Sequence, residues 1–476
     1  MTKILIINPP YLKNYSRPSR SPAVAKSGTL YYPIFLSYLA GYLEKKNYEI
    51  KLIDCIAENL EFDDICGIIR SFIPEFIISD SSIPSGKKDS LFLDSVKSAF
   101  PSVFCALVGP YPTAYSNEIQ NNNFKFDAFI LREYEFSAGK LIELKYKTNL
   151  KTVYLNDSTG IFKNGTGNPE PANLDEIPFV SSVYKRSLNP KKYFYSAGLY
   201  PVVSILSSRG CPFKCSFCNL PHTFFLTAYR RRTVQNLIDE FEFIKRELPD
   251  IKEIWIEDDS FNADLNYVKT FCAEKIKANN RLKWTINFNP RVYDEETLSL
   301  LRKAGCRLLV IGYESGLNSN LDIINKNCSV KDYLELDKLI AKNKLKVHGC
   351  FIIGLPYDAK QNVYETFALS KKLRLDTVQF FPVMLNKNTP LYDLYKNGGW
   401  LKTEDSDFYC PDGLHQTNAS LPDFSDRDIM ATCAEFRKKF YLRTEYFFYK
   451  FFSVIFSWGE LKRTVKSLIR FAKYLV

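Results

Sequence analysis

Three cysteines stand in one short stretch of the sequence, at a spacing that suits metal chemistry. Cys211, Cys215 and Cys218 lie in SSRGCPFKCSFCNLPH and follow the pattern C-x3-C-x2-C. In a cytosolic protein such a group indicates metal or redox chemistry more than disulfides. Three thiolates can bind three irons of a four-iron cluster and leave the fourth iron open for reaction. The alternative is a structural Cys3His zinc site, which His222 would complete.

The composition favours a cytoplasmic globular protein of about three domains. The 476 residues are 46% hydrophobic and 25% charged, as in folded soluble proteins. No apolar run reaches the roughly 18 to 20 residues that a membrane-spanning helix needs. The opening MTKILIINPP lacks a signal-peptide cleavage pattern. The other nine of the twelve cysteines are scattered singly, as buried small side chains would be.

The positive net charge is concentrated at the end of the chain. Residues 437–476 contain ten Lys or Arg and two Glu, which accounts for +8 of the total +11. Because the rest is nearly neutral, we expect no nucleic-acid groove. The aromatic run YFFYKFFSVIFSW at 446–458 is too short to cross a bilayer. It predicts either a helical cap or a peripheral membrane contact of this basic tail.

The elements that position the cysteines form two series of alternating strand-like and helix-like segments. Residues 1–150 predict a Rossmann-like, doubly wound parallel sheet, whose ligands would bind at the carboxyl ends of the strands. Residues 151–195 contain a Gly/Pro/Asn-rich piece and read as a linker. Residues 196–400 predict a partial (β/α)6 TIM-like barrel, and residues 401–476 a helical C-terminal extension. Strands are expected at 3–8, 49–54, 76–80, 103–108 and 128–131, and then at 202–207, 253–256, 283–287, 307–312, 346–353 and 377–383.

The cysteine loop resembles the CxxxCxxC motif of the radical S-adenosylmethionine (SAM) superfamily, including the aromatic Phe217 before the last cysteine. The segments IWIEDDSFNAD, IGYESGLNSNLDIINK and CFIIGLPYD resemble later motifs of that family in the same order. The resemblance implies a four-iron cluster and a bound SAM, which is cleaved to a 5′-deoxyadenosyl radical. It implies SAM contacts from Phe217, Glu257, Asp258, Glu314 and Ser315. It also implies an electron donor such as a flavodoxin or ferredoxin.

The first domain resembles the cobalamin-binding domain that precedes radical SAM barrels in one subgroup, which includes the anaerobic Mg-protoporphyrin cyclases. The residues that carry the resemblance, and that would contact cobalamin, are Pro9, Pro10, Ser81, Ser82, Gly109, Pro110 and Glu133. Arg132-Glu133-Tyr134-Glu135 stands where the subgroup has Gly-Glu-Gly-Glu. No histidine precedes His222, so the DxHxxG motif that gives cobalt an axial histidine is absent. We therefore expect any bound cobalamin to be base-off.

These features predict an enzyme that modifies a carbon centre of a small or lipid-like molecule. C-methylation and cyclisation or rearrangement are both compatible with them, and no general acid–base pair stands out. A methylthiotransferase would need three further clustered cysteines, whereas Cys55, Cys66 and Cys105 lie on three different predicted elements. A zinc-containing nucleic-acid-binding protein is the alternative from another class, and the nearly neutral body argues against it.

Overall fold

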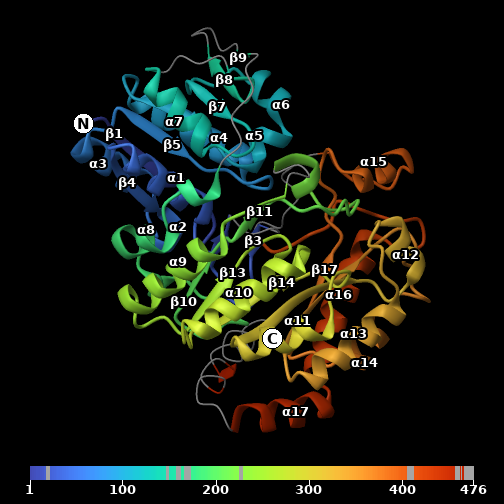
Figure 1. Ribbon diagram of the computed structural model, residues 1–476. Helices are drawn as coiled ribbons and strands as arrows, with labels where there is room; N and C mark the ends of the chain where they lie inside the picture. The colour runs from blue at the N-terminus through green and yellow to red at the C-terminus, as the bar shows by residue number, and fades with distance from the viewer. Residues whose placement is uncertain are drawn as a thin grey trace.

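Two sheets, each flanked by helices, make up most of the molecule (Figure 1). They are seen in a computed structural model, which describes residues 1–17, 22–145, 150–156, 162–165, 173–224, 229–404, 412–455, 461 and 464–465. The first sheet has seven strands in the order β4-β1-β5-β6-β7-β8-β9, and the second has six in the order β10-β13-β14-β15-β16-β17. Short ribbons pair β2 with β3 and β11 with β12.

The first sheet is parallel from β4 to β7, as its buried β-branched and aliphatic runs predict. Ile4 and Ile6 of β1 pack under α1 and α7, whereas Leu5 and Ile7 pack under α3, α4 and α6. Alternate side chains of β1 thus pack against helices on opposite faces of the sheet, which makes the sheet doubly wound. The parallel strands are β1 (Lys3–Asn8), β4 (Glu49–Asp54), β5 (Phe76–Ser79), β6 (Phe104–Leu107) and β7 (Ala128–Ile130). The helices are α1 (Ile34–Lys45), α2 (Cys55–Glu58), α3 (Phe62–Phe72), α4 (Gly86–Ala99), α5 (Pro110–Ala114), α6 (Ser116–Gln120) and α7 (Glu135–Glu143).

The chain order of this sheet reverses beside β1, because β4 lies on one side of β1 and β5 on the other. Loops leaving the carboxyl ends of β1 and β5 therefore turn to opposite faces and leave a crevice between them. Ligands of open α/β sheets bind at such a switch point. The first sheet thus offers one defined ligand position, next to Asn8 and Asp80.

The predicted linker at 151–195 is wrong in part. Strands β8 (Val153–Asn156) and β9 (Phe162–Asn164) extend the first sheet with two antiparallel pairings. Helix α8 (Val180–Ser187) follows and packs against α1 and α9. Strands β8 and β9 have only four and three residues, fewer than a typical strand, and the Gly/Pro/Asn-rich sequence that follows them is typical of a linker. Residues 157–161 and 166–172 lie outside the described part of the chain.

The second sheet is parallel throughout and follows chain order. Strand β16 shows how it is covered: Val347, Phe351 and Ile353 are buried, while His348 and Cys350 alternate with them and are half-buried. One face therefore packs under helices and the other lines a cavity. The strands are β10 (Val202–Ile205), β13 (Glu253–Ile256), β14 (Lys283–Phe288), β15 (Cys306–Glu314), β16 (Lys346–Ile353) and β17 (Thr377–Pro382). The helices are α9 (Val234–Glu247), α10 (Leu265–Lys277), α11 (Glu295–Lys303), α12 (Asn318–Ile323), α13 (Val330–Lys342) and α14 (Tyr364–Lys372).

Helix α15 (Pro390–Asn397) precedes the predicted extension at 401–476, which is helical in α16 (Asp426–Tyr441) and α17 (Thr444–Ile455), whereas its described residues 401–404 and 412–425 form no helix. The side chain of Tyr446 is buried, and its hydroxyl donates 2.7 Å to the carbonyl of Asp376, just before β17 begins. Helix α17 therefore caps the amino ends of the second sheet, at the bottom of Figure 1. Within the described residues, no helix combines the length and apolarity that crossing a bilayer requires.

Candidate active site

A cavity of about 490 Å³ is lined by residues that follow the carboxyl ends of strands in both sheets. The half-buried face of the second sheet forms one wall, and loops after β5 and β6 of the first sheet contribute to another. Its lining includes Cys211, Cys215, Phe217, Cys218, Glu257, Asp259, Glu314, Lys326, His348, Cys350, Gln379 and His415 from the second part of the chain. From the first part it includes Arg17, Phe35, Asp80, Ser81, Gly109, Pro110 and Tyr134. The cavity is where the predicted sites of both domains would meet.

The three cysteines of the loop all line this cavity. Arg291 donates 3.2 Å to the Cys215 thiol and lies 4.8 Å from the centre of the Phe213 ring. Burial raises the pKa of Cys218, and the neighbouring Cys215 raises it further. A cation beside the thiols favours their thiolate form, and a bound metal centre would hold the sulfurs as thiolates in spite of their burial. The donor set therefore fits a cluster held by three thiolates.

A preformed zinc centre is not seen in the described part of the chain. No three His, Cys, Asp or Glu side chains gather there around one point that could hold a single ion. The His222 ring instead contacts the carbonyl of Cys215, with 3.2 Å between Nε2 and the oxygen. A four-iron cluster spreads its thiolates over three separate irons, so it does not require such a tight group.

The acidic triplet after β13 divides its side chains between two roles. Glu257 and Asp259 line the cavity. Asp258, predicted as a SAM contact, is turned into the protein, where its Oδ1 accepts the N–H groups of Ser207 and Ser208 at 2.7 and 3.1 Å. Its Oδ2 accepts both serine hydroxyls. Asp258 thus fixes the backbone that leads into the cysteine loop, and Asp259 takes the cavity position.

The segment after β15 places Glu314 at the cavity and Ser315 away from it. Glu314 adopts a left-handed φ of 64°, and its carboxylate accepts 2.9 Å from the buried ammonium of Lys326. Burial alone would lower the pKa of Lys326, but Glu314 outweighs it and the pKa is raised. Ser315 is buried, and its hydroxyl accepts the N–H of Leu317 at 3.1 Å. The cavity here carries an ion pair, whereas the serine shapes the turn.

Of the residues predicted to contact cobalamin, the loops of the first sheet bring Ser81, Gly109 and Pro110 to the cavity. Gly109 has φ 107°, and a Cβ there would come within 2.2 Å of the Ser81 carbonyl, so only glycine fits. The other predicted contacts, Pro9, Pro10, Ser82 and Glu133, are not among the described residues that line the cavity.

Three of those other residues, Pro9, Ser82 and Glu133, have hydrogen-bond partners within the protein. The Pro9 carbonyl accepts 3.0 Å from Arg17, and the Ser82 hydroxyl lies 2.9 Å from the Tyr15 hydroxyl. Glu133 pairs with Arg209, two residues before the first cysteine of the loop. These residues support the crevice and do not form its surface.

A buried network of charges lies beneath the switch point of the first sheet. The Arg17 guanidinium grips Asp89 with two hydrogen bonds of 3.2 and 2.7 Å, and both side chains are almost fully buried. Asp80 is also buried and borders the cavity, and burial raises its pKa to about 7. This end of the cavity therefore contains an acid that is largely protonated below neutral pH.

Comparison with known proteins adds to this geometry. The model of the radical SAM superfamily matches residues 205–369, which contain the cysteine loop and most of the second sheet. The chain carries a radical SAM domain. An uncharacterized methyltransferase of Pyrococcus horikoshii is 28% identical over 79% of this chain and 80% of its own length. An anaerobic magnesium-protoporphyrin IX monomethyl ester cyclase of Rubrivivax gelatinosus is 24% identical over 77% of this chain and 66% of its own.

Two solved structures share the fold over more than the radical SAM domain. The cobalamin-dependent SAM radical enzyme OxsB, with aqua-cobalamin and SAM bound, aligns with a TM-score of 0.70 at 15% identity, covering 98% of this chain and 72% of its own. The radical SAM methyltransferase TsrM from Kitasatospora setae, with cobalamin and a [4Fe-4S] cluster bound, aligns at 0.64 and 16%, covering 85% and 79%. At these identities the likeness shows that both sheets belong to one shared architecture.

Sequence reasoning missed several residues of the cavity. His348, Cys350 and Gln379 project from the half-buried face of β16 and β17, where alternate residues face the cavity. Had the alternation along KVHGCFII been used to separate the two faces, it would have indicated His348 and Cys350. His415 follows a loop and packs edge-on against Phe381, with ring centres 5.4 Å apart. Nothing in the local sequence marks that long-range contact.

Proposed function

We propose that this chain is a cobalamin-dependent radical SAM enzyme that modifies a carbon centre of a small or lipid-like molecule. The observation that carries the proposal is one cavity lined by the three thiols of the radical SAM domain and by Ser81, Gly109 and Pro110 of the first sheet. In this proposal residues 1–150 are the cobalamin-binding domain, and the six-stranded sheet is a partial barrel. Cys211, Cys215 and Cys218 hold the cluster.

The two halves of the cavity would divide the work of binding. When bound, the cluster supplies the electron that cleaves SAM, and cobalamin supplies a transferable methyl group or a redox-active cobalt. Glu257 and Asp259 are placed to accept hydrogen bonds from the SAM ammonium, which are strong because both partners are charged. Phe217 adds an apolar ring to the cavity lining, and the ion pair of Glu314 with Lys326 presents a locally neutral wall. The enclosing walls exclude water from a reactive site.

The small lining residues of the first sheet favour a large ligand at the switch point. Gly109 admits no side chain, and Ser81 is fully buried beside it. Because no histidine occurs before His222, none from this half can reach the cobalt. The bound cobalamin should be base-off, and cob(II)alamin EPR showing nitrogen superhyperfine coupling would contradict this.

C-methylation and cyclisation or rearrangement both fit this cavity. The similarity to a methyltransferase and to a cyclase supports both, and an electron donor such as flavodoxin or ferredoxin would serve either. Methylthiotransfer is not favoured, because Cys55, Cys66 and Cys105 are buried on α2, α3 and β6 and do not line the cavity. A zinc-containing nucleic-acid-binding protein is not favoured by a cavity of this composition.

The experiment is metal, sulfide and cobalamin analysis of protein purified without oxygen from cells grown with cobalamin. We expect about four iron and four sulfide per chain, bound cobalamin, and release of 5′-deoxyadenosine when SAM and a reductant are added. Zinc in place of iron would overturn the proposal. Incubation with methyl-labelled SAM and candidate substrates then separates methylation from cyclisation by product mass.

We infer separately that the enzyme is cytoplasmic and that its basic tail could contact anionic membranes. Phe447 and Phe448 of α17 are 67% and 58% exposed, which suits an interfacial helix. Because α17 caps the amino ends of the second sheet, opposite the cavity, this contact would tether the enzyme without feeding its site. Vesicles of phosphatidylglycerol should co-sediment with the protein and vesicles of phosphatidylcholine should not. Binding that persists in the F447S/F448S variant would contradict a role for this face.

A further inference from the structure

A buried group of ion pairs joins the cysteine loop to the first sheet. The Arg209 guanidinium is 2% exposed and donates 2.5 Å to Glu135 and 3.0 Å to Glu133. Glu135 is the first residue of α7, and Glu133 lies in the turn that precedes it. Glu133 also pairs with Arg230. Two carboxylates of the first half thus meet two arginines of the second half.

The two arginines occupy facing positions at the stem of the cysteine loop. Arg209 belongs to β11 (Ser208–Arg209) and Arg230 to β12 (Arg230–Arg231), and they are direct partners in this antiparallel ribbon. Cys211 follows Arg209 by two residues. Whatever fixes the ribbon therefore fixes the orientation of the loop that carries the three thiols.

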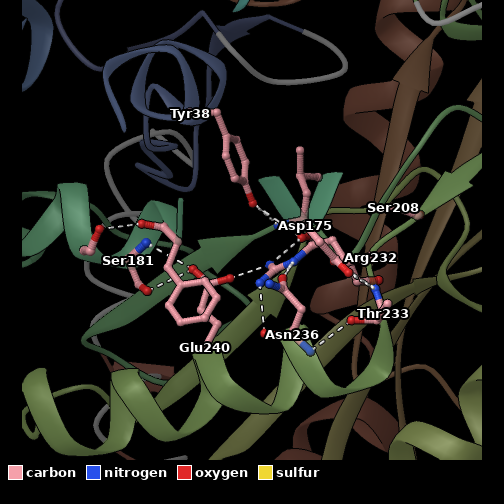
Figure 2. Close-up of polar contacts among 12 residues, drawn as sticks. Tyr38, Asp175, Ser181, Ser208, Arg232, Thr233, Asn236 and Glu240 are labelled. Atoms are coloured by element: carbon pink, nitrogen blue, oxygen red, sulfur yellow. Dashed lines mark hydrogen bonds and ion pairs between the residues drawn. The ribbon is translucent and has the colours of Figure 1, made fainter. Parts of the chain in front are cut away.

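Separate contacts hold the ribbon from the side of the second sheet. Asp258 binds Ser207 and Ser208 on the outgoing strand. On the returning strand, Arg232 pairs with Glu240 of α9 and donates 3.0 Å to the Leu206 carbonyl (Figure 2). Glu240 in turn accepts the Ser181 hydroxyl of α8 at 2.9 Å (Figure 2). The ribbon is thus anchored to its own sheet independently, and Arg209 adds the link to the other half.

The ion pairs of Arg209 are expected to fix the position of the cysteine loop more than they raise the free energy of unfolding. Removing charges from water to form a buried pair costs about as much as the pair returns, so an apolar replacement of both partners is often neutral. The two-armed guanidinium, however, fixes direction and distance at once. Arg209 also packs against Tyr38 of α1, with 5.3 Å between the guanidinium carbon and the ring centre.

We propose that Arg209, through Glu133 and Glu135, is a positioning residue that registers the cysteine loop against the first sheet. It rests on the proposed function in one respect: the register would set the separation between the cluster and the bound cobalamin. This assigns Glu133 to the loop stem and not to cobalamin contact. The left-handed φ of Arg132, 62°, lies in the turn that presents both carboxylates to the same guanidinium.

The test compares R209K and the R209M/E135L double variant with wild type, and uses Lys192→Met as the control. Lys192 also pairs with a carboxylate of the first half, Glu58, but this pair is 35% and 40% exposed and includes no residue of the ribbon that carries the cysteine loop. We expect R209M/E135L to retain its iron content. Amide exchange over residues 207–212 and 230–232 should become about tenfold faster. The cluster's midpoint potential should shift, since hydrogen bonds and nearby charges set it. K192M should match wild type in both.

The decisive measurement is made on cobalamin-loaded protein. The enhancement of cob(II)alamin spin relaxation by the reduced cluster reports their separation, and we expect it to fall in both Arg209 variants. If exchange, potential and relaxation in R209M/E135L all equal wild type, the proposal is overturned. Should the double variant fail to fold, R209K decides by the same three measurements. Absence of cobalamin from wild type would defeat the proposed function, while exchange and potential would still test the register.

Discussion

The carboxyl ends of the two sheets meet at one cavity but contribute different chemistry to it. The second sheet presents three thiols and the carboxylates of Glu257 and Glu314. The first presents Ser81, Gly109 and Pro110, together with Arg17, which is paired with Asp89, and the buried carboxyl of Asp80. Groups that bind or react must be exposed to the cavity. Groups that shape a pocket can be small, and their polar atoms can be hydrogen-bonded within the protein. The second half is therefore built for reaction and the first for holding a large ligand.

The strongest test of this contrast removes the thiols. Cys211→Ala, Cys215→Ala or Cys218→Ala should each abolish the four-iron cluster and the release of 5′-deoxyadenosine, because each of the three thiolates would hold a different iron of the cluster. Cys433→Ala is the matched control, since Cys433 is buried on α16. Iron and sulfide analysis measures the effect. Full iron content in any of the three variants would refute the assignment of its cysteine.

The converse test disturbs only the first half. Gly109→Ala places a Cβ within 2.2 Å of the Ser81 carbonyl and 2.7 Å of Asp80 at a φ of 107°. We expect cobalamin to be lost while iron content and 5′-deoxyadenosine release persist. Gly67→Ala on α3 is the matched control, since a Cβ there meets nothing within 4 Å, and it should retain cobalamin. If Gly109→Ala binds cobalamin like wild type, the crevice is not where it binds.

The pH dependence of stability tests whether the Asp80 carboxyl of the first half is buried. Burial raises the pKa of Asp80 to about 7, whereas in the unfolded chain it is near 4. Between these values the folded protein holds a proton that the unfolded chain has released, so raising the pH lowers stability. Asp80→Asn has no such group. Its stability advantage over wild type should grow by roughly 2 to 4 kcal/mol between pH 4 and pH 8, measured by urea unfolding. A constant difference would contradict this.

Substituting two neighbouring carboxylates of the second half should distinguish a residue that stabilises the fold from one that binds SAM. Asp258→Ala leaves two buried N–H groups and two hydroxyls without their acceptor, so it should cost about 2 to 3 kcal/mol of stability. Glu257→Gln should leave stability within about 0.5 kcal/mol and weaken SAM binding about tenfold through loss of a charge-assisted hydrogen bond. Calorimetry and SAM titration distinguish them. Weaker SAM binding in Asp258→Ala, with lower stability in Glu257→Gln, would mean that the two residues have each other's role.

The smallest expected effect concerns the turn that joins the two halves. Arg132 has a φ of 62°, which costs a non-glycine residue free energy. Arg132→Gly should therefore stabilise the protein by about 0.5 to 1 kcal/mol and leave cluster and cobalamin content unchanged. Thermal unfolding measures this. Destabilisation would mean that the Arg132 side chain makes contacts worth more than the strain.

Much of this architecture follows from the sequence, because buried parallel strands are apolar runs of recognisable length. The predictions for β1, β4, β13 and β16 have the same bounds as the strands in the structure. The cysteine loop is equally local, since its spacing alone indicates its chemistry. Strands β8 and β9 were not predicted, because they have only four and three residues and stand beside a Gly/Pro/Asn-rich segment.

The orientation of site residues was harder to predict than their position. Glu257, Asp258 and Asp259 are adjacent, and which of them faces the cavity depends on where β13 stops and its alternation breaks. Glu133 was placed by a local motif, but its partner Arg209 lies 76 residues away. Such pairings depend on how the two sheets meet, and no single stretch of sequence records that.

The central claim, that one cavity receives SAM on a cluster and cobalamin beside it, has one most direct test. The measurement is EPR spectroscopy of the reduced, cobalamin-loaded enzyme before and after SAM is added. We expect a four-iron signal whose shape changes with SAM, together with base-off cob(II)alamin whose relaxation is enhanced by the cluster. A cluster signal indifferent to SAM, or two signals without mutual relaxation, would contradict a shared cavity.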